Sequence, residues 1–177
     1  MNEKNTIKIR LYDSPCGRLL LGSFGGKLCL CDWQIEKRRE HVGRRLRKLL
    51  RADFEEGTSG IIERAARQLD EYFAGERKEF DAPLLFVGTE FQKAVWRDLL
   101  RIPYGATISY GEMARRICVP KAVRAVANAN GANAISIFAP CHRVIGSNHT
   151  LTGYGGGLDA KRLLLELESY YSLSGTD

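Results

Sequence analysis

Residues 140–144, which read Pro-Cys-His-Arg-Val, constrain this chain more than any other stretch. Apolar residues flank them on both sides, so the fold must shelter the Cys141 thiol from water. Pro140 stiffens the backbone there at a φ of about −65°. A thiol held beside the ionisable His142 is typical of a nucleophile, although free cysteine is also among the most buried and inert residue types. Neighbouring side chains on a strand point to opposite faces, so adjacency alone does not pair the two residues.

Further motifs surround this stretch on both sides. Upstream, residues 89–96 contain Thr-Glu-Phe-Gln and a Val-Trp pair, and residues 102–110 read Ile-Pro-Tyr-Gly-Ala-Thr-Ile-Ser-Tyr. Downstream, residues 151–158 read Leu-Thr-Gly-Tyr-Gly-Gly-Gly-Leu, and a predicted helix with Lys161 and Glu168 follows. In this order and spacing, the motifs resemble the O6-alkylguanine-DNA alkyltransferases, the methylated-DNA–protein-cysteine methyltransferases.

The resemblance is dense from Gly88 to Glu168, and before that only the general layout and the turn at residues 13–15 are similar. It implies an α/β (α+β) fold in two domains. Residues 1–87 would form a small antiparallel sheet with helices, which is ribonuclease H-like. Residues 88–177 would form the alkyltransferase domain, mostly helical and winged-helix-like, with a helix-turn-helix and the active-site cysteine.

The composition is that of an ordinary folded protein, with 177 residues, 44% hydrophobic and 27% charged. No apolar run is long enough to cross a membrane, and the N-terminal residues lack the apolar core of a secretory signal, so we expect no membrane contact. Five cysteines cannot all pair within one chain. This favours reduced thiols and a cytoplasmic protein.

The net charge of +6 divides equally between the two predicted domains, so it does not say which domain meets a polyanion. Its distribution says more, because residues 88–145 hold 8 basic and 3 acidic residues. Arg115, Arg116, Lys121 and Arg124 lie close together within that stretch. Such a cluster favours contact with phosphates, and a solvated helix face is the plain alternative.

The first domain is predicted to open as an antiparallel meander. Residues 6–11 alternate as a half-buried strand does, and turns at residues 14–17 and 25–26 separate it from strands that begin at Leu19 and Leu28. Residues 37–51 carry eight basic side chains. We expect an exposed, partly helical connector there, without a direct role in DNA binding.

An apolar stripe predicts a helix from Ile61 to Phe73, ended by Gly75, and residues 76–88 are predicted to be a linker. In the second domain, Thr89 with Gln92 forms a capping-box pattern that opens a helix.

Ser109 with Glu112 forms a second capping-box pattern, which opens a short helix through Ile117. The next helix is predicted over residues 121–130, after a break at Pro120. The two short helices make a helix-turn-helix. The second is slim and rich in alanine, and we expect Ala125 and Val126 to pack in the core.

The resemblance assigns DNA contacts to this second helix, at Lys121, Arg124 and Ala125, and implies that it enters the minor groove. Arg124 would fill the space of an extruded base, because the O6 atom of a stacked guanine is inaccessible to a buried thiol. Tyr110 would help to rotate the nucleotide and would donate a proton toward guanine N3. A packing tyrosine at a helix start is the alternative for Tyr110.

Cys141 would then attack the alkyl carbon and displace the guanine oxygen. A free thiol is only slightly ionised at neutral pH, so it needs a base. The resemblance assigns that role to His142, acting through a water molecule, with Glu168 to orient it. A solvated helix position is the alternative for Glu168. The thioether product has no evident way back, so each molecule would react once.

The resemblance also implies support for the loop and a pocket rim. Asn133 would tie the helix-turn-helix to the loop, while Pro140 and Arg143 hold the loop itself, Arg143 through backbone carbonyls. Carbonyls near Cys141 and Val144 would accept from the guanine amine. The rim would consist of Tyr154, Gly155 and Gly156, although a glycine-rich stretch is also typical of a flexible turn.

Two departures from the family are visible. Asn133 is followed by Ala134 where many members have proline, and the zinc ligands of some members have no clear counterpart. Cys29, Cys31 and His41 make a weak partial metal pattern, so we expect no metal and no cofactor. The expected partner is alkylated double-stranded DNA, with O4-alkylthymine as a second lesion beside O6-alkylguanine. The protein is expected to be a monomer.

Three other functions fit parts of the sequence. A damage-recognition protein of the alkyltransferase-like type would lack the nucleophile, which is present here as Cys141. A helix-turn-helix regulator would need long polar side chains where this helix has Ala122, Ala125 and Ala129. A cysteine hydrolase would need an oxyanion arrangement, and none is evident.

Overall fold

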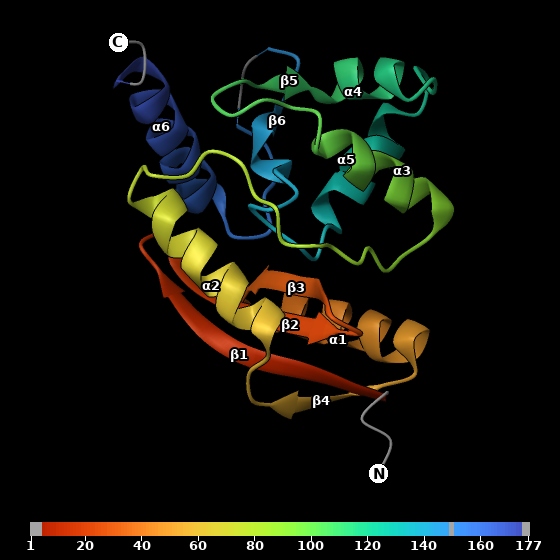
Figure 1. The fold of residues 1–177 in the computed structure, drawn as a ribbon. Helices are drawn as coiled ribbons and strands as arrows, with labels where there is room; N and C mark the ends of the chain where they lie inside the picture. The colour runs from red at the N-terminus through yellow and green to blue at the C-terminus, as the bar shows by residue number, and fades with distance from the viewer. Residues whose placement is uncertain (1–4, 149–150, 175–177) are drawn as a thin grey trace. The chain divides into compact units, whose positions relative to one another are not determined.

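The computed structural model describes residues 5–148 and 151–174 of the chain. The chain divides into two compact units, Met1–Gly88 and Thr89–Asp177. The first unit runs from red to yellow in Figure 1, and the second from green to blue. Within the described residues, no helix is both long and apolar enough to cross a lipid bilayer.

The first unit is built on a four-stranded sheet with the order β3-β2-β1-β4. β1 (Thr6–Ser14) pairs antiparallel with β2 (Gly17–Phe24), which pairs antiparallel with β3 (Lys27–Trp33). The predicted meander is therefore confirmed.

The prediction of a wholly antiparallel sheet is wrong, because β4 (Asp53–Glu56) pairs parallel to β1. The chain crosses one face of the sheet as α1 before it enters β4, and such a crossover returns a strand in the parallel direction. β4 reads Asp-Phe-Glu-Glu, so it is a short polar edge strand without the apolar alternation that reveals strands in a sequence.

The expected connector at residues 37–51 is a complete helix, α1 (Glu36–Leu50), which corrects the prediction of a partly helical segment. Its inner face buries Val42, Gly43 and Leu46. A Cβ atom on Gly43 would lie 3.2 Å from the Phe54 ring, so the glycine lets the helix approach β4 closely. The eight cations of residues 37–51 outnumber these buried residues, so the sequence shows no clear apolar stripe that would predict a complete helix.

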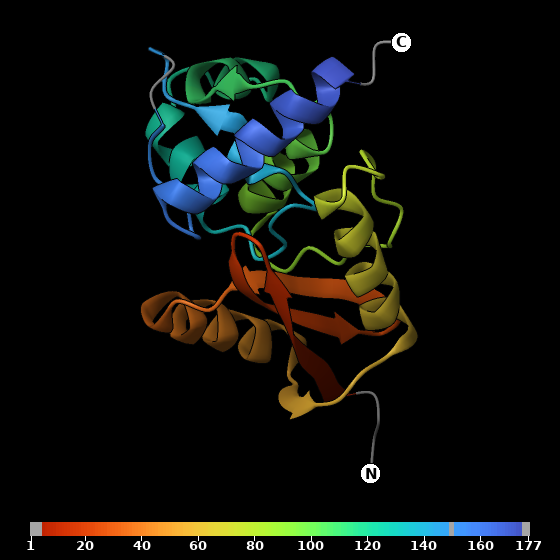
Figure 2. The same cartoon turned by 90° about the vertical axis from the view of Figure 1, so that its left-hand side faces the viewer.

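The other face of the sheet is covered by α2 (Gly60–Phe73), as predicted to within one residue. Figure 2 shows α1 and α2 on opposite sides of the sheet. The Ser59 hydroxyl caps α2 by accepting from the N–H of Ile62 at 3.2 Å. The following linker pairs with β3, where Leu28 donates to the Pro83 carbonyl and accepts from Leu85, both at 2.8 Å.

The second unit is mostly helical. Its elements in chain order are α3 (Glu90–Leu99), β5 (Ile108–Ser109), α4 (Tyr110–Arg116), α5 (Val123–Gly131), a 3-10 turn η2 (Cys141–Arg143), β6 (Val144–Ile145) and α6 (Leu158–Ser174). β5 and β6 form a two-stranded parallel sheet that the sequence did not reveal. It joins the start of α4 to the segment after the cysteine.

One predicted capping box is complete and the other is present only as its hydroxyl cap. Thr89 and Gln92 form the full capping box at the start of α3. At α4, the Ser109 hydroxyl accepts from the N–H of Glu112 at 3.0 Å, while the Glu112 carboxylate accepts from Arg115. Local side chains therefore determine where both helices begin.

α5 begins at Val123 and not at Lys121, so Lys121 lies before the helix. The residue at its N-cap is Ala122, which makes no side-chain cap hydrogen bond, and this explains why the sequence did not locate the start. Val126 is buried as expected, but Ala125 is exposed, so its expected core position is wrong. Trp96 of α3 donates to the Ala129 carbonyl at 2.8 Å and anchors α5.

Leu21→Ala in β2 should lower the free energy of unfolding by about 2–5 kcal/mol, because Leu21 is fully buried and its loss leaves a cavity. Leu11→Ala in the neighbouring β1 is the matched control, since Leu11 is half exposed. Urea unfolding measures both. An equal loss for the two variants would contradict the described core.

Candidate functional site

Cys141 is the first residue of η2 and is only 4% exposed. Two short backbone bonds shape the turn, from the N–H of Cys141 to the Ala139 carbonyl at 2.8 Å and from that of Arg143 to the Pro140 carbonyl at 3.0 Å. Ile137, just upstream, has a φ of 73°. Such a value is strained for a β-branched residue and is commonest near functional sites.

Two asparagines hold this loop. The Asn133 amide, fully buried, donates to the Ala139 carbonyl at 2.9 Å and accepts from the N–H of Ile135 at 3.0 Å. Asn130, on α5, donates to the carbonyl of Cys141 itself at 3.3 Å. The last turn of α5 is therefore bonded directly to the cysteine, a contact that the sequence did not suggest.

His142 and Glu168 form a buried pair. The His142 Nε2 atom lies 2.6 Å from Glu168 Oε2, and both side chains are almost completely excluded from solvent. The solvated position considered for Glu168 is therefore wrong: α6 directs this carboxylate inward.

Arg143 completes the cluster with a two-pronged ion pair. Its Nε donates to Glu168 Oε1 at 2.8 Å and its Nη2 to Oε2 at 3.1 Å. Its third contact is to the Ile102 carbonyl, at 2.7 Å. The bond from Arg143 to a backbone carbonyl was predicted, but its contact with the Glu168 carboxylate was not. No local sequence pattern reveals that contact, because Glu168 lies far along the chain.

Glu168 accepts a fourth hydrogen bond from the N–H of Gly105, at 3.2 Å. A Cβ atom on Gly105 would overlap the Ser172 side chain of α6, and the φ of Gly105 is 80°. Only glycine fits this close approach without strain. The turn after α3 is thereby joined to α6 beside the pair.

Burial alone would raise the pKa of the Glu168 carboxyl, but the attraction of His142 and the hydrogen bonds from His142 and Arg143 outweigh it and hold that pKa far below its ordinary value. Because Arg143 is always charged, Glu168 stays ionised even beside a neutral imidazole. Burial lowers the pKa of His142, and the positive charges of Arg143 and Lys161 lower it further against the pull of Glu168. At neutral pH, His142 is a neutral base.

The other ring nitrogen of His142, Nδ1, is buried and has no hydrogen-bond partner among the described residues. Since Nε2 faces a carboxylate, it carries the ring proton, which leaves Nδ1 as an acceptor. A buried acceptor of this kind is usually satisfied by an ordered water molecule. The imidazole is therefore set up to take a proton.

Tyr110 begins α4 and is partly buried, with its hydroxyl 3.5 Å from the Thr152 carbonyl. Burial raises the pKa of this phenol and the nearby Cys141 raises it further, so the hydroxyl keeps its proton at neutral pH.

Lys161 lies close by, with its Nζ 5.9 Å from the centre of the Tyr110 ring. Its Nζ donates to the carbonyls of Val144, at 2.7 Å, and Thr152, at 2.9 Å. Burial lowers the pKa of this lysine to about 8. Lys161 was seen in the sequence only as part of a helix, and its reach to two loops depends on the fold.

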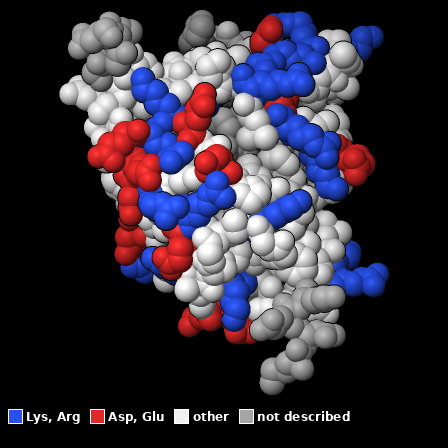
Figure 3. Space-filling view, viewed as in Figure 1, with Lys and Arg blue, Asp and Glu red and all other residues white. Residues whose placement is uncertain are grey.

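The remaining predicted residues lie in two places. Lys121, Arg124 and Ala125 are exposed around the start of α5. Figure 3 shows lysine and arginine side chains over much of the surface near α4. Tyr154, Gly155 and Gly156 are partly buried in the turn before α6, which closes with a bond from the Gly157 N–H to the Tyr154 carbonyl at 2.9 Å.

Across residues 5–148 and 151–174, no three His, Cys, Asp or Glu side chains lie close enough together to hold a metal ion. All five cysteines are free thiols.

Comparison with known proteins identifies the family. Residues 90–170 match the DNA-binding domain of 6-O-methylguanine DNA methyltransferase, and residues 7–86 match its ribonuclease-like domain. The chain belongs to the 6-O-methylguanine DNA methyltransferase family.

Its curated relatives carry the name methylated-DNA–protein-cysteine methyltransferase. The protein of Mycobacterium tuberculosis is 47% identical over 165 residues, which cover 92% of each chain. That of Methanosarcina acetivorans is 46% identical over 158 residues, 89% of this chain and 96% of the relative. The crystal structure of Mycobacterium tuberculosis OGT in complex with DNA has a TM-score of 0.79 at 46% identity and covers 93% of this chain and 94% of that one.

Glu168→Gln should lower the free energy of unfolding at pH 7 by about 3–5 kcal/mol, because Arg143 would be left buried without its partner charge. The folded-state pKa of Glu168 is depressed, so its stabilisation is complete above the ordinary value of 4.5 and is lost as the pH falls below it. The difference between wild type and variant should therefore narrow in acid.

Urea unfolding between pH 7 and pH 3 measures this difference. Glu166→Gln, at an exposed position of the same helix, is the matched control and should change little. A Glu168→Gln difference that does not depend on pH would contradict the ionised, buried carboxylate.

Proposed function

We propose that this protein is a DNA-repair methyltransferase that flips O6-alkylguanine, and also O4-alkylthymine, out of duplex DNA and transfers the alkyl group irreversibly to Cys141. The observation that carries the proposal is the buried cysteine loop beside the His142–Glu168 pair, in a chain whose family acts on methylated DNA. Each molecule reacts once, as a stoichiometric reagent.

In the proposed reaction, His142 Nδ1 takes the thiol proton through a water molecule, and Glu168 stabilises the imidazolium that forms. The Cys141 sulfur forms a bond to the alkyl carbon while the bond from that carbon to guanine O6 breaks, and its electrons pass into the purine. Tyr110 donates a proton to N3 and is reprotonated afterwards. The neutral resting state of His142 and the protonated phenol of Tyr110 support these roles.

The rest of the predicted site has a place in this proposal. Arg124 fills the gap left by the flipped base, and Lys121 and Ala125 lie against the DNA in the minor groove. Ala125, which is small and exposed in the first turn of α5, supports close approach to a groove. Tyr154, Gly155 and Gly156 form the rim that receives the base. The Cys141 and Val144 carbonyls, each with a second lone pair beside its bond to Asn130 or Lys161, accept from the guanine amine.

We assign the supporting role in the loop to Asn133, Pro140 and Arg143. Residues 1–87 form the ribonuclease H-like domain, and residues 88–177 the winged-helix-like alkyltransferase domain. The protein acts as a monomer in the cytoplasm, without a cofactor and without membrane contact. The five free thiols support a reducing compartment.

Cys141→Ala should abolish alkyl transfer while DNA binding persists, because the substitution removes the acceptor sulfur and leaves the exposed surface of α5 unchanged. After incubation with a duplex that contains O6-methylguanine, intact-mass measurement should find wild type heavier by one CH₂ unit and the variant unmodified. Cys118→Ala, at the exposed cysteine, is the matched control and should react normally.

The same experiment separates the alternatives. If wild type is unmodified but binds the lesion tightly, the protein is a damage-recognition protein. If wild type is unmodified and does not bind the lesion, a regulator or a hydrolase is favoured. Methyl uptake on another cysteine in Cys141→Ala would overturn the assignment of the nucleophile.

Arg124→Ala should slow reaction with a duplex lesion far more than reaction with free O6-benzylguanine, because only the duplex requires an extruded base to be replaced. Single-turnover rates on both substrates measure the difference. Arg124→Lys keeps the charge but not the planar group, so an intermediate loss is expected. Arg162→Ala, on the exposed side of α6, is a control. Equal losses on the two substrates would count against the proposed role.

A further inference from the structure

The strongest positive surface outside the candidate site lies on α1 in the first unit. Residues 37–51 carry eight cations and a single acidic residue, Glu40. Nothing in the proposed chemistry uses them. Several of these cations contact other parts of the first unit, and the others face solvent.

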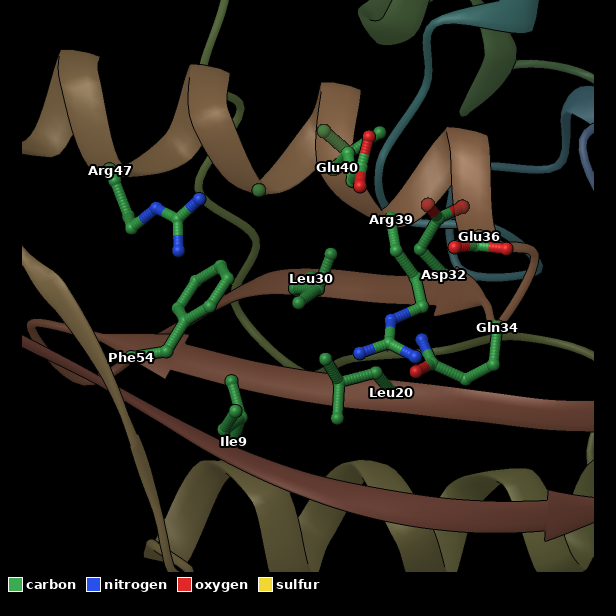
Figure 4. A pocket seen from close by; sticks show the side chains of 12 residues that line it. Ile9, Leu20, Leu30, Asp32, Gln34, Glu36, Arg39, Glu40, Arg47 and Phe54 are labelled. Carbon is green, nitrogen blue, oxygen red and sulfur yellow. The ribbon is translucent and has the colours of Figure 1, made fainter.

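Three arginines of α1 lie against their own unit, and two of them have a named partner there. Arg38 forms an ion pair at 2.7 Å with Asp32, which is buried in β3. Arg39 and Arg47 line a cavity of about 510 Å³ between α1 and the sheet, and Figure 4 shows both side chains reaching from the helix toward the strands. The Arg47 guanidinium lies 5.3 Å from the centre of the Phe54 ring. These side chains cover apolar sheet surface with their stems.

Lys37, Arg44 and Lys48 have no such explanation. They recur at helical spacing and form one exposed line on α1, with His41 between the first two. Val42 and Leu46 are buried on the opposite side of the helix. None of the three makes an ion pair with a residue that the structure describes. We call Lys37, Arg44 and Lys48 the basic stripe.

Parts of the stripe are unfavourable for the helix itself, although Lys48 lies in the last turn, where the helix dipole favours a cation. Lys37 lies in the first turn, where the helix dipole disfavours a cation. Arg44 and Lys48 are four residues apart, so their like charges repel each other. Glu36 and Glu40 are the acidic side chains of α1, and Glu40 lines a hollow of about 210 Å³ with Lys37, His41 and Arg44. Two carboxylates beside eight cations leave the helix with a large excess of positive charge, which a polyanion lying along it would neutralise.

The spacing of the stripe suits a nucleic-acid backbone. From Lys37 to Lys48 the helix rises about 16 Å. Duplex DNA presents a phosphate about every 3.4 Å of its axis on each strand, so several phosphates fall within that length. Against the expectation from the sequence that residues 37–51 have no direct role in DNA binding, we propose that the basic stripe of α1 is a second DNA-binding surface, which contacts the phosphate backbone without reading sequence. This inference rests on the proposed function only for the identity of the polyanion.

The test compares two triple variants with equal loss of charge. The stripe variant carries Lys37→Gln, Arg44→Gln and Lys48→Gln. The control carries Arg18→Gln, Lys27→Gln and Arg67→Gln, three exposed cations of the same unit outside α1. All six positions are exposed, and equal urea midpoints establish that both variants fold. Affinity is measured on an undamaged duplex that is too short for two protein molecules.

Binding of the stripe variant should depend less on salt. If all three cations contact phosphates, the slope of log affinity against log salt should fall by about 2.7 in magnitude. Between 50 and 200 mM salt, wild type should then lose about 40-fold more affinity than the stripe variant. The control should keep the wild-type slope.

Other outcomes overturn the proposal in distinguishable ways. Equal slopes for stripe variant and wild type, or equal changes in both triples, would exclude a specific phosphate contact by α1. A loss that appears only on long duplexes would indicate contact between copies of the chain in place of DNA contact. Failure of wild type to take up a methyl group from a duplex that contains O6-methylguanine would refute the proposed function, whereas normal uptake with unchanged slopes would refute the stripe alone.

Discussion

The second unit depends on one buried charge, the carboxylate of Glu168. It accepts from His142, twice from Arg143 and from the backbone of Gly105, so α6, the cysteine loop and the turn after α3 meet at two oxygen atoms. A carboxylate away from water is very costly unless its hydrogen-bonding capacity is filled. The segments around Cys141 are therefore held in one arrangement by electrostatics as well as by packing.

The same arrangement connects α5, the helix proposed to contact DNA, to the cysteine loop. α5 exposes Arg124 at its start, while Asn130 near its end bonds the Cys141 carbonyl and Ala129 accepts from Trp96. Asn133, just after the helix, holds the loop that precedes the cysteine. If bound DNA displaced α5, the cysteine loop would move with it, because Asn130 and Asn133 bond the end of the helix to that loop.

Local features of the sequence predicted the elements that local chemistry controls. The capping residues Thr89 and Ser109 located the starts of α3 and α4, and the apolar stripe located α2 to within one residue. The predictions failed where distant contacts decide the structure. β4 is polar and exists because β1 offers it a partner, and α1 is anchored by only a few buried residues among many charges.

The sequence by itself determined that this chain presents a nucleophile-like cysteine with a neighbouring base, because the residue types and their order carry that chemistry. Only the tertiary structure decided how the base is tuned. Glu168 lies 26 residues from His142 in the chain, and its pairing with both His142 and Arg143 follows from the way α6 packs against the loop. Likewise, the eight cations of residues 37–51 could be counted in the sequence. Only the fold shows which of them cover the sheet and which face solvent, because burial depends on which surfaces meet in space.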